Sequence, residues 1–299
     1  MDVIIDFINS NIVNPYITHQ PPATHKLHAH YPWSADYSLL RQFLVMWTFL
    51  YLSSLAIYYL FATLTFTLFY LDGDKGQKGR NSARWQWDTR QMRDEIVLST
   101  WSLAPMSGLT AVMETWILMG HGNLYTVVDQ YGYLYFAVSP LLFLLFTDFL
   151  IYWIHRYLHH RYFYPLHKLH HHYKETTPFS AFAFHPLDGF AQSFPYHIFV
   201  LIFPMHQYLY MATLLLVGLW TVNIHDRVTL NLWGVNGAAH HTIHHTKFNY
   251  NYGQYFTWCD RVFGTYKDPL LYYPYKAVEG AEGAEVMAGE EVVTKGKEE

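Results

Sequence analysis

The sequence predicts an all-α, polytopic membrane helical bundle that carries a cytosolic, histidine-rich cap for two metal ions. Apolar residues make up 52% of the 299-residue chain and charged residues only 14%, against about a quarter in an average soluble domain. Several stretches contain no charged residue and are long enough to cross a bilayer. Fifteen of the twenty histidines fall between residues 155 and 245. These three observations favour a membrane protein with a metal site over a soluble domain.

Three segments in the first half of the chain are expected to span the membrane, at about 42–71, 96–120 and 131–154. The first contains thirty residues without a formal charge, which exceeds the roughly twenty apolar residues that a spanning helix needs. The second contains Pro105 and Glu114. The third contains Pro140 and Asp148 and runs directly into the first histidine cluster.

A fourth uncharged stretch, from Gly189 to Ile224, is too long for a single span. Its 36 residues would make a helix of about 54 Å, whereas the hydrocarbon core of a bilayer is about 30 Å thick. Pro195 and Pro204 interrupt it. We therefore expect a helical hairpin over 190–224, which returns the chain to the side of the membrane where the first histidine cluster lies.

The basic residues of the loops predict on which side of the membrane the histidine clusters lie. The loop 72–95 contains six lysines and arginines, and the connection 121–130 contains none. Because cytosolic loops carry the excess of Lys and Arg, the first loop and both histidine clusters are expected on the cytosolic side. The segment 1–38 is then lumenal or interfacial. The catalytic domain is expected to cover residues 39–276.

The tail 277–299 is rich in Gly, Ala, Glu and Val and has no aromatic residue, so it is expected to be disordered and cytosolic. It ends with Lys295 and Lys297 close to the terminus, a pattern similar to the dilysine retrieval signal of endoplasmic-reticulum membrane proteins. The net charge of −4 argues against a nucleic-acid partner. Cys259 is the only cysteine, which excludes an intramolecular disulfide and a thiolate metal site.

The histidine spacings are those of a metal site. His155 and His159 are four residues apart on one helical face and can bind the same ion. The pattern His-x2-His-His occurs at 167–171 and again at 241–245. Adjacent residues of a helix point about 100° apart, so each unit can serve two neighbouring ions. The expected metal ligands are His155, His159, His167, His170, His171, His225, His241, His244 and His245.

Further residues are expected to assist these ligands in catalysis. Asp148 lies one heptad before His155 and would accept an imidazole N–H, with a helix-packing role as the alternative. Asp226 would orient His225. For His185, metal ligation and hydrogen bonding to a ligand stay equally open. Four residues are expected to support the ligands instead of binding metal: His160, His172, His240 and Asp188.

The composition of the site favours iron. Soluble di-iron bundles use Glu and Glu-x-x-His ligands from four helices, and no such pair occurs here. Structural zinc needs only four ligands. About eight to ten imidazoles with open positions suit two iron ions that activate dioxygen, although ligand softness alone would also allow zinc or copper.

Four segments resemble the fatty acid hydroxylase/sterol desaturase superfamily, and within it the sterol C-5 desaturases. They are FTDFLIYWIHRYLHH (146–160), LHKLHH (166–171), AFHPLDGFAQSFPYHI (183–198) and GAAHHTIHHTKFNYNYGQYFTWCDRVFGTY (237–266). The resemblance places three histidine boxes at 155–160, 167–171 and 240–245. His172 departs from the family pattern, as does Phe182, at a position where some relatives carry histidine.

The resemblance implies an enzyme of the endoplasmic-reticulum membrane with two histidine-bound iron ions. It would use O2 and electrons from NADH or NADPH, passed through cytochrome b5 and its reductase, to place a C-5(6) double bond in a Δ7-sterol. One alternative is a lipid hydroxylase or C-4 methyl sterol oxidase of the same superfamily. Another is a non-enzymatic metal-binding membrane protein.

Overall fold

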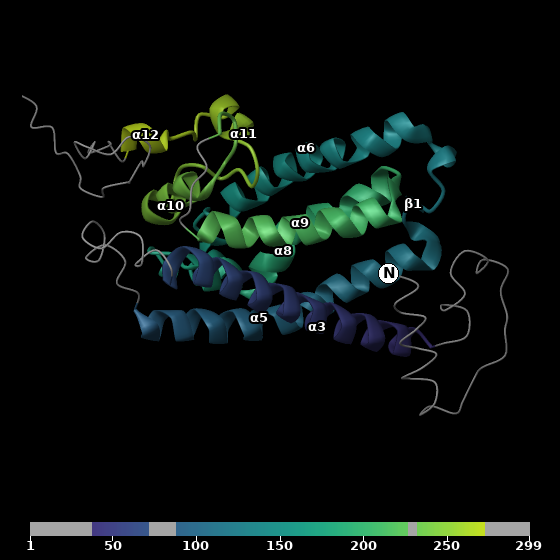
Figure 1. The fold of residues 1–299 in the computed structure, drawn as a ribbon, viewed down its shortest axis with the longest axis horizontal. Helices are drawn as coiled ribbons and strands as arrows, with labels where there is room; N and C mark the ends of the chain where they lie inside the picture. Colours follow the sequence, from purple (N-terminus) through teal and green to yellow (C-terminus); the bar gives the residue numbers. More distant parts are fainter. Residues whose placement is uncertain (1–37, 72–87, 227–231, 273–299) are drawn as a thin grey trace, which may run out of the picture.

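The computed structural model describes residues 38–71, 88–226 and 232–272, and these form one elongated bundle of long helices with short helices at one end (Figure 1). The expected N-terminal segment, apart from Ser38, and the expected C-terminal tail with its two lysines lie outside the described residues. The domain limits at 39 and 276 therefore stay a prediction.

Four helices are long and apolar enough to cross a membrane, which confirms the polytopic membrane bundle. They are α3 (Leu39–Phe66), α5 (Thr89–Trp116), α6 (Gly132–Leu158) and α9 (Gln207–His225). A π-helical turn extends each of the first two, η3 (Thr67–Leu71) after α3 and η4 (Ile117–His121) after α5. The three spans expected in the first half of the chain are thus present, with shifted ends.

The second span begins earlier than the sequence indicated. Helix α5 starts at Thr89, where the Asp88 carboxylate accepts a hydrogen bond from the backbone N–H of Arg90 and caps the helix. The last part of the expected polar loop is therefore helical. Glu95 is fully buried and accepts hydrogen bonds from the side chains of Gln91 and Thr177. Its charge made the segment look like a loop, but tertiary partners allow its burial.

The segment expected to form a helical hairpin contains α8 (Pro186–Ile202) followed by α9. The chain reverses at β2 (Met205–His206), which pairs in parallel with β1 (Leu124–Tyr125). The short 3-10 helix η5 (Val128–Gln130) follows β1. The connection after the second span and the tip of the hairpin therefore meet at one end of the bundle (Figure 1).

The opposite end carries the histidine clusters on short elements (Figure 1). After α6 come α7 (Tyr164–His167), η6 (His170–His172) and η7 (Pro178–Phe182), and after α9 come α10 (Ala238–Lys247), α11 (Trp258–Val262) and α12 (Pro269–Tyr272). Both clusters thus lie at the same end, as the hairpin predicted, while the side of the membrane that this end faces stays a prediction.

The hydrophobic core extends between the two ends of the bundle. Phe143, Phe199 and Met205 are fully buried between α6, α8 and the hairpin tip. Nearer the histidines, the buried Tyr58 donates a hydrogen bond to the carbonyl oxygen of Phe179, at 2.9 Å, and the rings of both residues pack in an edge-to-face arrangement. This contact connects α3 to η7, so that the spans and the segment that follows the first histidine cluster form one packed unit.

Candidate metal centre

The nine histidines expected as metal ligands converge into two groups. In each group, one ring nitrogen from every member lies within 4.8 Å of one from every other member. The first group has five members, His155, His159, His167, His171 and His244. The second group has four members, His170, His225, His241 and His245. Eight of the nine are buried, and His159 is half-buried.

In the first group the Nε2 atoms face one another at short distances. His155 and His171 each lie 3.1 Å from His167, and His159 lies 3.2 Å from His244, all measured between Nε2 atoms. Two imidazoles that bind one ion at about 2.1 Å and at right angles have nitrogens about 3 Å apart. The spacing therefore matches lone pairs that point at a common ion.

The second group repeats this arrangement. The Nε2 atom of His241 lies 3.0 Å from those of His225 and His245, and His225 lies 3.3 Å from His170. Four nitrogens converge on one point here, and the chain brings them from η6, the end of α9 and α10.

Adjacent histidines belong to different groups. His170 belongs to the second group and His171 to the first, and the neighbours His244 and His245 divide in the same way. The rings of His171 and His245 are 4.8 Å apart between centroids, so the two groups lie side by side. The His-x2-His-His spacing allowed one unit to serve two ions without assigning its histidines, and the observed division would let two ions lie close together.

The other ring nitrogen of several histidines is held by a hydrogen bond, which fixes the tautomer. Nδ1 of His155 donates to the carbonyl oxygen of Tyr252 at 3.0 Å, and Nδ1 of His244 donates to that of Tyr250 at 2.8 Å. Nδ1 of His225 donates to the carbonyl oxygen of Thr221 at 2.7 Å. With the proton on Nδ1, the lone pair of Nε2 is free to bind metal.

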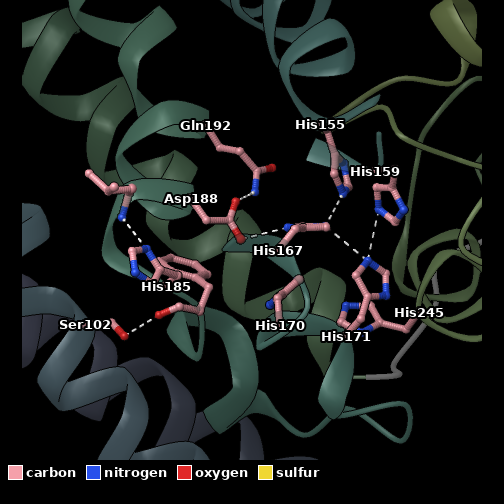
Figure 2. A network of polar contacts seen from close by, with 12 residues as sticks. Ser102, His155, His159, His167, His170, His171, His185, Asp188, Gln192 and His245 are labelled. Carbon is pink, nitrogen blue, oxygen red and sulfur yellow. Dashed lines mark hydrogen bonds and ion pairs between the residues drawn. The ribbon is translucent and has the colours of Figure 1, made fainter. Parts of the chain in front are cut away.

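His167 has a carboxylate partner instead. Its Nδ1 lies 2.7 Å from Oδ2 of Asp188, and Oδ1 of the same carboxylate accepts a hydrogen bond from Gln192 at 2.8 Å. Figure 2 shows His167 between Asp188 on one side and His155 on the other. The supporting role expected for Asp188 agrees with this geometry.

We expect Asp188→Asn to weaken metal binding by about 10- to 100-fold, the usual effect of removing a hydrogen-bond partner of a metal-bound imidazole. The amide can offer its N–H2 to His167 and so favours the wrong tautomer. Iron content after purification and activity measure the effect. Gln192→Leu is the milder control, because it leaves both carboxylate oxygens in place. Equal iron content in Asp188→Asn and the unchanged protein would contradict the prediction.

Two aspartates have different partners from those expected. Asp148 accepts no imidazole N–H in the described structure; its Oδ1 accepts the backbone N–H groups of residues 254–256, at 2.7–3.3 Å. Asp226 contacts the side chain of Asn223, while the carbonyl of Thr221 orients His225. The expectation that Asp148 orients an imidazole was therefore wrong, and its helix-packing alternative fits.

His185 lies outside both groups. It caps α8, and its Nδ1 accepts the backbone N–H of Leu187 at 3.2 Å, on the far side of Asp188 from the metal groups (Figure 2). His160 and His172 are exposed. His240 is buried against the ring of Tyr266. None of these four belongs to either group.

Some functional contacts had no signal in the sequence. Tyr250, Tyr252 and Thr221 take part through backbone carbonyls, which every residue has, so no residue type could indicate them. Gln192 was detectable in principle, because it lies four residues after Asp188 and shares its helical face.

Burial and neighbouring imidazoles favour the neutral form of several histidines in the two groups. Burial, followed by the nearby His167, lowers the pKa of His171 to about 2. Burial also lowers the pKa of His244 and His245 well below the ordinary value. Neutral imidazoles are the form that binds metal.

These shifts predict acid sensitivity of the metal-free protein. The pKa of these three histidines is about 6.5 in the unfolded chain and lower in the folded protein, so below pH 6.5 the unfolded state binds more protons and stability falls. We expect a lower melting temperature for the metal-free protein at pH 5.5 than at pH 7.5, measured in one detergent. The same melting temperature at both values would contradict this.

A cavity of about 530 Å³ leads from the histidines into the bundle, within the roughly 300–1,000 Å³ of small-molecule sites. His155 of the first group and His170, His225 and His241 of the second form part of its wall. The rest is mostly apolar and comes mainly from α3, α5, α8, α9 and η7, including Phe182. A lipid-like molecule in this cavity would contact members of both histidine groups.

Comparisons with known proteins agree with this geometry. The fatty acid hydroxylase family matches residues 140–265, which contain all nine histidines. The chain is 39% identical to the lathosterol oxidase of Mus musculus over 276 residues, 90% of this chain and 86% of that protein. It is 43% identical to a Δ7-sterol 5(6)-desaturase of Gibberella zeae over 257 residues, 85% of this chain and 70% of that protein.

A Δ7-sterol 5(6)-desaturase of Schizosaccharomyces pombe is 43% identical over 231 residues, 77% of this chain and 68% of that protein. No solved structure matches the chain. The likeness to the sterol desaturases extends well beyond the histidine boxes into the membrane spans. The chain belongs to the fatty acid hydroxylase family, alongside the Δ7-sterol 5(6)-desaturases and lathosterol oxidases.

Proposed function

We propose that the protein is a membrane-bound oxidase that introduces a C-5(6) double bond into a Δ7-sterol, with O2 as the oxidant. The observation that carries the proposal is an apolar cavity whose wall contains members of both histidine groups. A substrate in this cavity would present its C–H bonds directly to two metal ions. The relatives that are sterol desaturases supply the substrate class.

The donor set suits two iron ions, one in each histidine group. All nine donors are imidazole nitrogens, and the Nδ1 hydrogen bonds of His155, His167, His225 and His244 direct Nε2 toward the common points. Bound iron would supply the activation of dioxygen and the removal of two hydrogens from neighbouring carbons. The protein contributes the position of the ions, the exclusion of water and the placement of the substrate.

The cavity gives a sterol a route from the bilayer. Ala212 and Leu215 of α9 form part of its wall and are also exposed on the outside of the bundle. On the facing helix α3, Ile57 also forms part of the wall. We infer that the sterol enters between α3 and α9, and that its rigid rings then lie along the apolar wall.

The sterol hydroxyl must lie near the metal groups, because C3 is separated from C5 by a single carbon. Three polar side chains of the cavity wall are available at this end. They belong to Gln192, Thr221 and Gln254. The amide of Gln192 donates a hydrogen bond to Asp188, and the amide of Gln254 donates to the hydroxyl of Thr221 at 3.5 Å. The backbone carbonyl of Thr221 also accepts a hydrogen bond from His225. We infer that the 3-hydroxyl group binds among these three residues.

Electrons are proposed to come from NADH or NADPH through cytochrome b5 and its reductase, at the cytosolic face of the endoplasmic reticulum. Arg161, Lys168 and Lys174 are exposed at the histidine end of the bundle. Such basic residues attract an acidic donor and raise the rate of encounter.

The test is expression in cells that lack C-5 desaturation, followed by sterol analysis. We expect Δ5,7-sterols to return, because the diene forms only when two hydrogens are removed, and the diene absorbs in the near ultraviolet. His170→Ala serves as the inactive control, since it removes one of the four nitrogens of the second group. A well-expressed protein that yields no diene would refute the proposal, and an alcohol product would indicate the hydroxylase alternative.

A further inference from the structure

A second polar cluster lies in the cavity wall, away from the histidine groups. The carboxylate oxygen Oε1 of Glu114 accepts a hydrogen bond from the hydroxyl of Tyr210 at 2.6 Å and from Nδ1 of His197 at 2.9 Å. The three residues come from α5, α9 and α8. All are at least 97% buried. Glu114 and His197 form part of the cavity wall.

The other oxygen of this carboxylate, Oε2, has no hydrogen-bond partner among the described residues. A buried carboxylate oxygen without a donor costs free energy, more than a neutral group would. The residue that carries it borders a cavity large enough for a lipid. The missing donor is therefore expected from a molecule inside the cavity.

The cluster lies too far from the metal groups to bind the 3-hydroxyl group of the sterol. On α8, His197 follows Asp188 by nine residues, which places it about 13 Å farther along the helix. Asp188 itself holds a member of the first histidine group. The 3-hydroxyl group is separated by only a few bonds from the carbons that react. A sterol with ring B at the metal groups would instead extend its side chain toward Glu114.

We propose that the Glu114 cluster is a second binding subsite that accepts a hydroxyl group on the side chain of the sterol. This inference rests on the proposed function, because it takes the position of ring B from the reaction. The hydroxyl would donate to Oε2 of Glu114, while Tyr210 and His197 hold the carboxylate by its other oxygen. The preferred substrate class is then a Δ7-sterol with a hydroxylated side chain.

The Glu114 cluster also connects three helices. If it had only this structural role, a change of Glu114 would have a different effect on sterol binding. A carboxylate that only joins α5, α8 and α9 affects every sterol equally when it is changed. A subsite for a hydroxyl group affects the hydroxylated sterol more. The comparison of two sterols therefore separates the two roles.

The experiment uses lathosterol and 25-hydroxylathosterol with the purified protein in nanodiscs. Binding is measured by displacement of a fluorescent sterol, and turnover by diene formation. We expect the hydroxylated sterol to bind about 10-fold more tightly, the contribution of one hydrogen bond to a charged group. Equal affinity for the two sterols would overturn the subsite. Absence of diene from both sterols would refute the desaturase function. The affinity ratio, that of the hydroxylated sterol to that of lathosterol, would still decide whether the subsite exists.

Glu114→Gln keeps the size of the side chain and removes its charge, and we expect the affinity ratio to fall toward one. Glu95→Gln is the matched control, because Glu95 is a second buried glutamate of the same helix, and it does not form part of the cavity wall. This variant is expected to keep the ratio. A Glu114→Gln protein that loses affinity for both sterols by the same factor would show a purely structural role and overturn the proposal.

Discussion

His244→Ala is expected to abolish activity, with a loss of more than about 100-fold, because a direct metal ligand contributes more than the 10- to 100-fold of a residue that only orients one. The Nε2 atom of His244 lies 3.2 Å from that of His159, and its Nδ1 is held by the carbonyl of Tyr250. His244 is fully buried. Alanine would leave four imidazoles and an empty space in the first group. Iron content per chain, measured together with diene formation, should fall from about two to about one.

The matched comparison is His245→Ala. His245 is the next residue of α10 and equally buried, but it belongs to the second group. Each variant should lose the iron of a different group, so the spectra of the remaining iron should differ between the two. His172→Ala, which changes an exposed histidine outside both groups, should retain iron and activity. Two irons and full activity in His244→Ala would contradict the two-group assignment.

Asp148→Ala is expected to have the largest effect on stability. Three backbone N–H groups, those of Gln254, Tyr255 and Phe256, share one carboxylate oxygen as their acceptor. Asp148 is fully buried, so water cannot replace it. Leaving these donors without a partner should cost roughly 3–5 kcal/mol. Thermal unfolding of the protein in detergent measures the change.

Asp148→Asn provides the control, because the amide oxygen can still accept from the three backbone groups. We expect its stability to lie close to that of the unchanged protein and its iron content to be normal. If Asp148→Asn were stable and iron-loaded but inactive, Asp148 would have a chemical role beyond holding residues 254–256. An unchanged melting temperature in Asp148→Ala would refute the structural role.

Local patterns in the sequence were sufficient to predict the spans, the hairpin and the nine histidines that converge. Long uncharged segments predict spans because a bilayer has a set thickness. Histidines three and four residues apart share a helical face whatever the rest of the chain does. The ends of the elements were less predictable. Helix α5 begins at Thr89 and includes Glu95, whose burial depends on Thr177, 82 residues away in the sequence.

Contacts with distant segments also distinguish two buried aspartates, Asp148 and Asp188. Asp148 and Asp188 are both buried carboxylates near histidines in the sequence, but only Asp188 contacts an imidazole. The partner of Asp148 is the backbone of residues 254–256, more than a hundred residues later. Contacts between distant segments depend on how helices pack, and no local spacing encodes them.

The sequence by itself determined an all-α membrane protein with converging histidines, because hydropathy and helical periodicity are properties of short segments. Tertiary structure alone decided which histidine belongs to which group, since His170 and His225 meet only after the hairpin returns the chain. It also decided the Nδ1 partners, which are mostly backbone carbonyls, and it placed Glu114, His197 and Tyr210 together. These last contacts depend on three helices that pack around one cavity.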